Sequence, residues 1–143
     1  MSCFSKCALL LIAILSIVLC NVVVVFSAAQ GPMTTVRVFN LLADDNKGQK
    51  INLTLHCKSK NNDLGSKLLP EGSSFEWSFA NNVNKPALYS CAISWQNVSG
   101  TFVIYDQHRD WGRCQECVWR AEQDGLYQYN GQQGPLILQL HWP

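Results

Sequence analysis

The sequence lacks an excess of charge of either sign. Its 143 residues carry 11 lysines and arginines against 10 aspartates and glutamates. Nucleic-acid-binding proteins and strongly cationic membrane-active peptides both depend on excess positive charge. The balance therefore argues against both classes, and we expect no nucleic-acid partner.

The sequence also lacks the short motifs of common hydrolases, since neither G-x-S-x-G nor H-E-x-x-H occurs in it. His56, His108 and His141 are scattered, although a catalytic triad can still assemble in space. Asp106 and Asp110 lie close in sequence, but nothing marks them as a catalytic carboxylate pair. No second ligand pair has the spacing of a zinc finger. We therefore predict a protein that is not an enzyme and holds no metal or cofactor.

Only one apolar run in the sequence is long enough to span a bilayer. It extends from Ala8 to Phe26, after Lys6, and the small residues Ser27, Ala28 and Ala29 follow it. This order is typical of a secretory signal peptide cleaved just before Gln30. A membrane anchor is the alternative, because about 19 apolar residues can cross a bilayer.

We expect residues 1–29 to be removed, because Asn21 interrupts the run and the small-residue exit follows at once. No repeat, low-complexity tract or linker divides the remainder. Residues 30–143 should thus form a single secreted, extracellular domain of 114 residues, with no stable membrane insertion. Lys6 leaves with the leader, so this domain carries 10 basic and 10 acidic residues.

Removal of the leader also makes the cysteine count even. The chain has seven cysteines, and Cys3, Cys7 and Cys20 belong to the leader. Four remain in a chain bound for an oxidising compartment, where disulfides persist. We therefore predict two disulfides among Cys57, Cys91, Cys114 and Cys117.

Four cysteines allow three connectivities. If Gln96–Gly100 is a hairpin turn, Cys91 lies opposite about Tyr105, and the next segment leaves the sheet at that end and finishes at Cys114. We therefore prefer the pairs Cys91–Cys114 and Cys57–Cys117. The alternative is a local Cys114–Cys117 bridge with Cys57–Cys91.

Apolar and polar side chains alternate through most of the expected domain. This period of two indicates strands with one buried face. The expected strands cover Thr35–Leu42, Ile51–Cys57, Ser74–Phe79, Tyr89–Trp95, Thr101–Asp106, Cys117–Glu122, Leu126–Tyr129 and Leu136–Trp142. The expected turns between them cover Asp44–Gly48, Asn61–Gly65, Pro70–Gly72, Asn81–Pro86, Gln96–Gly100, Asp124–Gly125 and Asn130–Gly134. We predict an all-β fold, a small antiparallel β-sandwich of about seven to eight strands with two disulfides.

Two sequons agree with export. Asn52-Leu53-Thr54 and Asn97-Val98-Ser99 both fit N-x-[ST] without proline. Asn52 falls on the polar face of its strand and Asn97 in a turn, so both are candidate glycosylation sites.

Two polar loops are candidate contacts for a partner, because loops on a rigid scaffold often carry recognition. The candidate residues are Gln107, His108, Arg109, Asp110, Trp111 and Arg113 in one loop, and Asn61, Asn62 and Asp63 in the other. The first loop runs into the C-x-x-C of Cys114 and Cys117. A thiol oxidoreductase would need these two cysteines bonded to each other and exposed.

An ordered set of residues in this chain resembles the plant self-incompatibility S1 family, the S-protein homologues. The set comprises His56-Cys57-Lys58-Ser59-Lys60, Asp63-Leu64-Gly65, Trp77, Phe79, Cys91, Trp95, Tyr105, Arg109-Asp110, Cys114, Cys117-Val118-Trp119 and Asp124-Gly125-Leu126-Tyr127. It spans the chain from about Val36 to Trp142. Asn61 and Asn62 depart from the family, which often has acidic residues before Asp63.

The resemblance implies a small secreted β-sandwich with two disulfides that acts in signalling rather than catalysis. In poppy-type self-incompatibility, a stigma-secreted member is recognised by a pollen membrane protein and stops incompatible pollen. Our leading hypothesis is therefore a secreted ligand for a cell-surface receptor protein. The alternative is an extracellular defence protein. A buried His–carboxylate pair in a cleft would favour an enzyme, and a protruding rigid loop would favour an enzyme inhibitor.

Overall fold

The computed structural model describes residues 31–44, 49–130 and 134–143. The expected signal peptide and its cleavage site lie outside the described residues. Pro32–Pro143 forms one compact unit. Within the described part of the chain, no helix is both long and apolar enough to cross a membrane.

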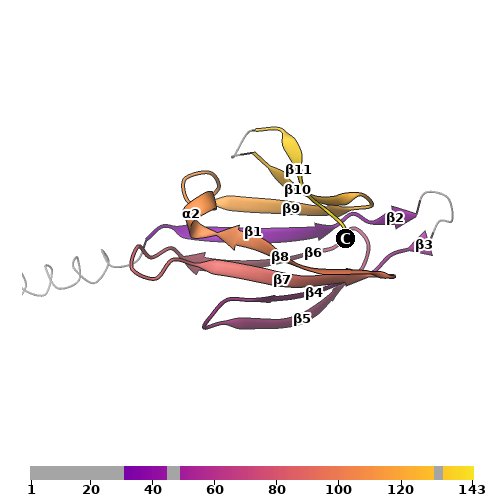
Figure 1. The fold of residues 1–143 in the computed structure, drawn as a ribbon, viewed down its shortest axis with the longest axis horizontal. Coiled ribbons are helices and arrows are strands. Elements are labelled where there is room, and N and C mark those ends of the chain that lie inside the picture. The colour runs from indigo at the N-terminus through magenta and orange to yellow at the C-terminus, as the bar shows by residue number, and fades with distance from the viewer. Residues whose placement is uncertain (1–30, 45–48, 131–133) are drawn as a thin grey trace, which may run out of the picture. The chain divides into compact units, whose positions relative to one another are not determined.

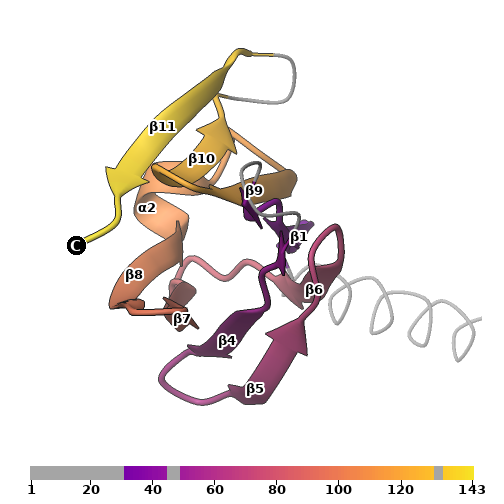
Figure 2. The same cartoon turned by 90° about the vertical axis from the view of Figure 1, so that its right-hand side faces the viewer.

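Two β-sheets face each other in this unit (Figures 1 and 2). The five-stranded sheet has the order β11-β10-β9-β1-β6. Its strands are β1 (Met33–Asn40), β6 (Ser74–Ala80), β9 (Glu116–Glu122), β10 (Gly125–Tyr129) and β11 (Leu136–His141). The four-stranded sheet has the order β5-β4-β7-β8. Its strands are β4 (Leu53–Lys58), β5 (Asp63–Leu69), β7 (Leu88–Trp95) and β8 (Val98–Asp106).

Two smaller elements complete the described fold. Strands β2 (Ala43–Asp44) and β3 (Gln49–Lys50) pair with each other, and a one-turn helix, α2 (Gln107–Asp110), connects β8 toward β9. All eight strands expected from the sequence are present, and the all-β sandwich is confirmed.

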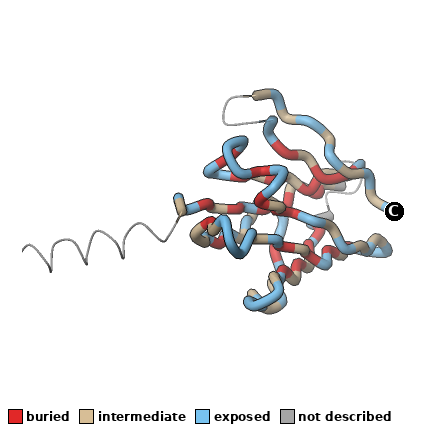
Figure 3. Tube along the Cα trace, turned by 60° about the vertical axis from the view of Figure 1, so that its left-hand side comes forward, coloured by how far each residue is buried: buried red, intermediate tan, exposed pale blue. Residues whose placement is uncertain are grey.

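The core lies between the sheets and follows from the alternation in the sequence (Figure 3). Strand β1 buries Val36 and Val38, strand β4 buries Leu53 and Leu55, and the side chain of Trp119 enters from β9. Burying each such side chain stabilises the fold by roughly 1.5–3 kcal/mol. Five large aromatic side chains of the strands belong to this cluster, with Phe75 and Phe79 partly buried and Trp77, Trp95 and Trp119 buried.

Two features of the sheets differ from the sequence prediction. Strand β5 occupies Asp63–Leu69, where we expected a turn followed by an unassigned segment. It is an edge strand with Gly65 at a positive φ of 71°, so its side chains do not alternate cleanly. In addition, β9 lies parallel to β1, whereas we expected antiparallel pairing throughout.

The β7–β8 hairpin is tighter than predicted, and this changes its register. Trp95 pairs with Val98, so only Gln96 and Asn97 form the turn, and Gln96 has a φ of 46°. A register shift follows between Tyr89 and Ser90. Cys91 consequently lies opposite Phe102, and Tyr89 rather than Cys91 lies opposite Tyr105.

The disulfides are Cys57–Cys91 and Cys114–Cys117. Cys57 and Cys91 are direct neighbours on the antiparallel strands β4 and β7, with their Cα atoms 4.0 Å apart. Cys117 lies on β9 in the other sheet. The preferred pairing of Cys57 with Cys117 and Cys91 with Cys114 is therefore wrong, and the alternative connectivity is the one present.

Candidate functional site

Three connections lie at the same end of the two sheets, at the left of Figure 1, and we call this the loop end. They are residues 59–62 between β4 and β5, residues 81–87 between β6 and β7, and residues 107–115 between β8 and β9. Strand register explains their proximity, because Lys58 pairs with Ser90 and Leu88 pairs with Asp106. Both predicted contact loops therefore share one surface with the β6–β7 connection.

Gln107 joins two of these connections. Its backbone N–H donates to the carbonyl of Ala87 at 2.9 Å. Its side-chain oxygen accepts from the Ala87 N–H at 3.0 Å, and its side-chain amide donates to the Asn82 carbonyl at 3.0 Å. The residue is only 4% exposed, so its polar groups form hydrogen bonds within the protein and are not available to a partner.

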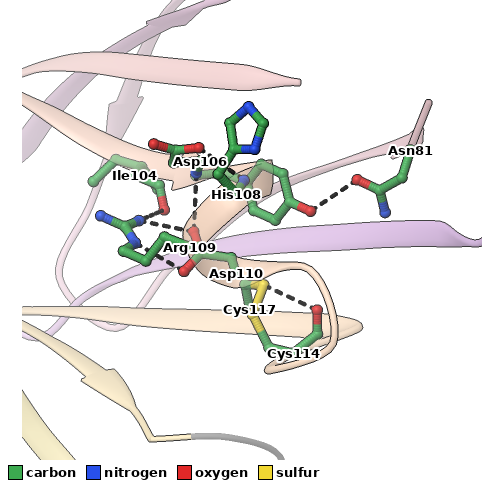
Figure 4. Close-up of polar contacts among 9 residues, drawn as sticks. Asn81, Ile104, Asp106, His108, Arg109, Asp110, Cys114 and Cys117 are labelled. Atoms are coloured by element: carbon green, nitrogen blue, oxygen red, sulfur yellow. Dashed lines mark hydrogen bonds and ion pairs between the residues drawn. A yellow bond between two sulfur atoms is a disulfide. The ribbon is translucent and has the colours of Figure 1, made fainter. Parts of the chain in front are cut away.

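Asp110 holds α2 against the end of β8 (Figure 4). Its carboxylate accepts from the Asp106 N–H at 2.9 Å and from Nε and Nη2 of Arg109, each at 2.8 Å. The carboxylate also raises the pKa of the Arg109 guanidinium above its ordinary value. Asp110 is 2% exposed, and a buried carboxylate needs such partners because an unpaired one is costly to bury.

The remainder of the loop turns back toward β9. Asp106 caps α2, because its side chain accepts from the His108 N–H at 2.9 Å. The Cys114 N–H donates to the Asp110 carbonyl at 3.2 Å, and Arg113 donates to the Asn130 side chain at 2.9 Å. Gly112 has a φ of 85°, a left-handed conformation that glycine adopts without strain.

The Cys114–Cys117 disulfide closes this loop from inside (Figure 4). Cys114 is 7% exposed and Cys117 is 1% exposed. The thiol-oxidoreductase alternative requires this bond together with exposure of the cysteines. The bond is present and the exposure is not, so the bridge acts as a structural constraint.

The predicted contact residues of this loop thus fall into two groups. Gln107 and Asp110 are buried and hold the loop in place. His108, Arg109, Trp111 and Arg113 are exposed and can reach a partner. The polar sequence gave no sign of this division, because it depends on contacts with another connection.

The second predicted loop is more exposed. Asn61, Asn62 and Asp63 are all exposed, and the Asn62 N–H donates to the hydroxyl of Ser59 at 3.1 Å. The Asp63 carboxylate accepts from the Gly65 N–H at 2.8 Å and lies 2.6 Å from His56 Nε2.

Both contacts lower the pKa of Asp63 below its usual 3.8, and the hydrogen bond from the Gly65 N–H makes the larger contribution. The side chains of His56 and Asp63 are both exposed. The pair therefore lacks the burial that we required of an enzyme's His–carboxylate pair.

Sequence reasoning missed the contribution of the β6–β7 connection. We expected a turn at Asn81–Pro86, but Asn81 is buried. Its side chain donates to the hydroxyl of Thr34 at 2.7 Å. Its side-chain oxygen accepts from the hydroxyl of Tyr105 at 2.8 Å, and Figure 4 draws this bond at Asn81. Burial raises the pKa of Tyr105. A single buried asparagine in a polar run leaves no periodic signal.

Large apolar side chains are exposed at the loop end. Val83 in the β6–β7 connection is 73% exposed, Leu88 at the start of β7 is 49% exposed, and Trp111 after α2 is 42% exposed. The two sequons lie at the opposite end. Asn52 precedes β4 and Asn97 sits in the β7–β8 turn, and both side chains are exposed.

Comparisons with known proteins agree with this architecture. A family model described as "Plant self-incompatibility protein S1" matches residues 35–142. S-protein homolog 24 of Arabidopsis thaliana is 44% identical over 79 residues, which cover 54% of this chain and 53% of that protein. S-protein homolog 6 is 39% identical over 101 residues, or 70% of this chain and 69% of the relative. S-protein homolog 2 is 37% identical over 100 residues, or 66% and 62%. The match thus spans about half the length of the first of these relatives and about two thirds of the other two.

Proposed function

The chain belongs to the plant self-incompatibility protein S1 family, and on this premise we propose that it is a secreted signalling ligand recognised by a cell-surface receptor protein. It acts by binding rather than by catalysis. Pollen–stigma recognition is one process that such a ligand would serve. The proposal includes cleavage of residues 1–29, which exposes one domain to the extracellular medium.

The observation that carries the proposal is the construction of the loop end. Buried polar groups, chiefly Gln107 and Asp110, hold the backbone of the 107–115 connection in one conformation. Exposed Trp111 and its neighbours then face outward from a fixed frame. A rigid loop with an exposed tryptophan suits protein binding, because ordering costs little and aromatic side chains contribute strongly at interfaces.

The positions of the two sequons also support a contact surface at the loop end. Glycans on Asn52 and Asn97 would occupy the opposite end of the sandwich and leave the loop end open. Two modified sites and a recognition surface can therefore coexist on this small domain.

The test is binding of the fluorescently labelled mature protein to intact plant cells. We expect saturable binding that protease treatment of the cell surface abolishes. Replacing two exposed residues of the loop, Trp111→Ala with Arg113→Ala, should weaken binding at least tenfold, which is about 1.4 kcal/mol. Leu68→Ala is the matched control, because Leu68 is 63% exposed near the other end of β5 and should leave binding unchanged.

Both variants should retain two disulfides and unchanged thermal unfolding, which separates loss of contact from loss of fold. Equal binding by the loop variant and the wild type would contradict the contact site. Binding to cells that survives protease treatment would contradict a protein receptor. Recovery of a secreted hydrolase as the cross-linked partner on intact cells would favour the inhibitor alternative instead.

A further inference from the structure

A groove lies between two connections at the loop end. Residues 59–61, after β4, form one wall, and residues 84–88 form the other. Phe79 and Tyr89 also line it, and its volume is about 630 Å³. Gln107 fixes one wall through Ala87, so the groove adjoins the 107–115 connection.

The charged residues lining this groove are both basic. Lys60 and Lys85 stand on opposite walls, and the lining includes no acidic residue among the described positions. In the ranges that the structure describes, no carboxylate lies within ion-pair distance of either ammonium group. The nearest carboxylate along the chain, Asp63, is engaged by Gly65 and His56. The groove is thus locally positive in a domain without net charge.

Apolar side chains form part of the groove surface. The rings of Phe79 and Tyr89 pack together with centroids 4.8 Å apart, and Leu88 and Pro86 lie exposed beside them. An apolar pocket with a few charged groups at its margin is a common form for a binding site. Its chemistry selects an apolar group flanked by negative charge.

We propose that this groove binds an acidic peptide segment with one apolar side chain, presented by the receptor. The apolar side chain contacts Leu88 and Phe79, while flanking carboxylates contact Lys60 and Lys85. This proposal rests on the proposed function, because it names the chemistry of the receptor that the ligand recognises.

A protein segment fits the groove better than an acidic polysaccharide does. Sugar rings stack on open aromatic faces, but Tyr89 is only 4% exposed and offers little face. The exposed apolar surface comes instead from Leu88 and Pro86, whose aliphatic groups match an aliphatic or aromatic side chain.

The experiment uses the secreted mature protein and a fluorescein-labelled probe, the peptide Gly-Asp-Glu-Leu-Asp-Glu-Gly. Fluorescence anisotropy measures its affinity, and amide chemical shifts in NMR spectra locate its site. We expect shifts at Lys60, Lys85 and Leu88. The double variant Lys60→Glu with Lys85→Glu should weaken binding at least tenfold. Lys67→Glu, on the middle of β5, reverses one charge outside the groove as a control and should change binding less than twofold.

Two further probes test the two halves of the recognition. A peptide with serine in place of leucine should bind at least fivefold more weakly, and one with lysine in place of every acidic residue should not bind. Equal binding by all three peptides, or shifts away from the groove, would overturn the proposal. An oligogalacturonate that binds the groove more tightly than the acidic peptide would overturn it in favour of a carbohydrate.

Binding to intact cells then separates this proposal from the proposed function. Lys60→Glu with Lys85→Glu should reduce cell binding as the Trp111 and Arg113 replacements do. If the lysine variant binds cells normally while the loop variant does not, the groove proposal fails and the ligand function stands. If the wild-type protein binds no cells, the ligand function fails. The peptide titrations then decide separately whether the groove binds an acidic peptide.

Discussion

The core of the sandwich and its loop end each contain one disulfide, and the surroundings of the two bonds differ. Cys57–Cys91 joins two neighbouring strands of one sheet within the core and links residues 34 apart in sequence. Cys114–Cys117 links residues three apart and lies beneath an exposed loop. In the core, buried apolar side chains surround the bond. At the loop end, the bond works beside the buried polar groups of Gln107 and Asp110.

The core and the loop end are thus held by different kinds of contact in this fold. Apolar contacts are tolerant of the exact identity of surface residues, so the sandwich can persist while exposed loop residues change. Polar contacts are directional and fix the path of a loop at little cost in apolar surface. Related chains can therefore vary the exposed residues of such a loop on one scaffold.

The largest expected effect is the loss of the core disulfide. Replacing both cysteines, Cys57→Ala with Cys91→Ala, should lower the free energy of unfolding by about 4 kcal/mol, from the loop-closure entropy of a separation of 34 residues. Replacing Cys114 and Cys117 by alanine should cost only about 1.5 kcal/mol, because they are three residues apart. Urea unfolding of both variants measures the two costs.

Each double variant also checks the connectivity. Because the two bonds are independent, the remaining pair should stay oxidised, and a thiol-reactive dye should find no free thiol under denaturing conditions. Two free thiols in either variant would show that the bonds cross between the two regions. Equal costs for the two variants would contradict the difference in loop-closure entropy between the core disulfide and the loop-end disulfide.

A smaller loss of stability is expected when the Asp110 carboxylate, which holds the 107–115 connection, is replaced. Asp110→Asn replaces an acceptor of three hydrogen bonds by an amide, which leaves the Asp106 N–H and the Arg109 guanidinium poorly paired. We expect a loss of about 2 kcal/mol in the free energy of unfolding. Faster hydrogen exchange should be confined to the amides of residues 106–114, since local opening need not involve the core.

Asp106→Asn is the matched control for this replacement. It makes the same chemical change four residues earlier, but asparagine caps a helix about as well as aspartate does, so stability should hardly change. Faster exchange of the Val36 and Val38 amides in Asp110→Asn would mean that this carboxylate supports the sandwich as a whole. Equal effects of the two replacements would mean that its burial is unimportant.

The same division explains what the sequence could and could not predict. Eight strands were predictable, because a sheet with one buried face imposes a period of two on residues such as Leu53, Leu55 and Cys57. Strand β5 was not, because an edge strand with a left-handed Gly65 leaves no such period. The predicted disulfide pairing was wrong because the β7–β8 turn contains only Gln96 and Asn97, which places Cys91 opposite Phe102, and the sequence pattern does not give the length of this turn.

The candidate site was predictable as two polar loops but not as one surface. Both loops were predicted from their polar composition. Their proximity at one end of the sandwich depends on the strand order, which only the structure shows. The burial of Gln107 and Asp110 could not be read from the sequence, because their partners belong partly to the β6–β7 connection. Polar residues that hold a loop and polar residues that face solvent have the same composition.

The smallest expected effect concerns the exposed counterpart of Asp110. Hydrogen bonds from the Gly65 N–H and His56 lower the pKa of Asp63, so its folded pKa lies below the usual 3.8. A group with a lowered folded pKa contributes stability above its unfolded pKa and loses that contribution as the pH falls through its folded pKa. We therefore expect these contacts to break at pH values below 3.8.

An NMR titration of the Asp63 carboxyl carbon and the Gly65 amide measures this transition, and both signals should share one midpoint below 3.8. His56→Gln should raise that midpoint only part of the way, because the Gly65 N–H makes the larger contribution. A complete return to 3.8 in this variant would assign the effect to His56 alone.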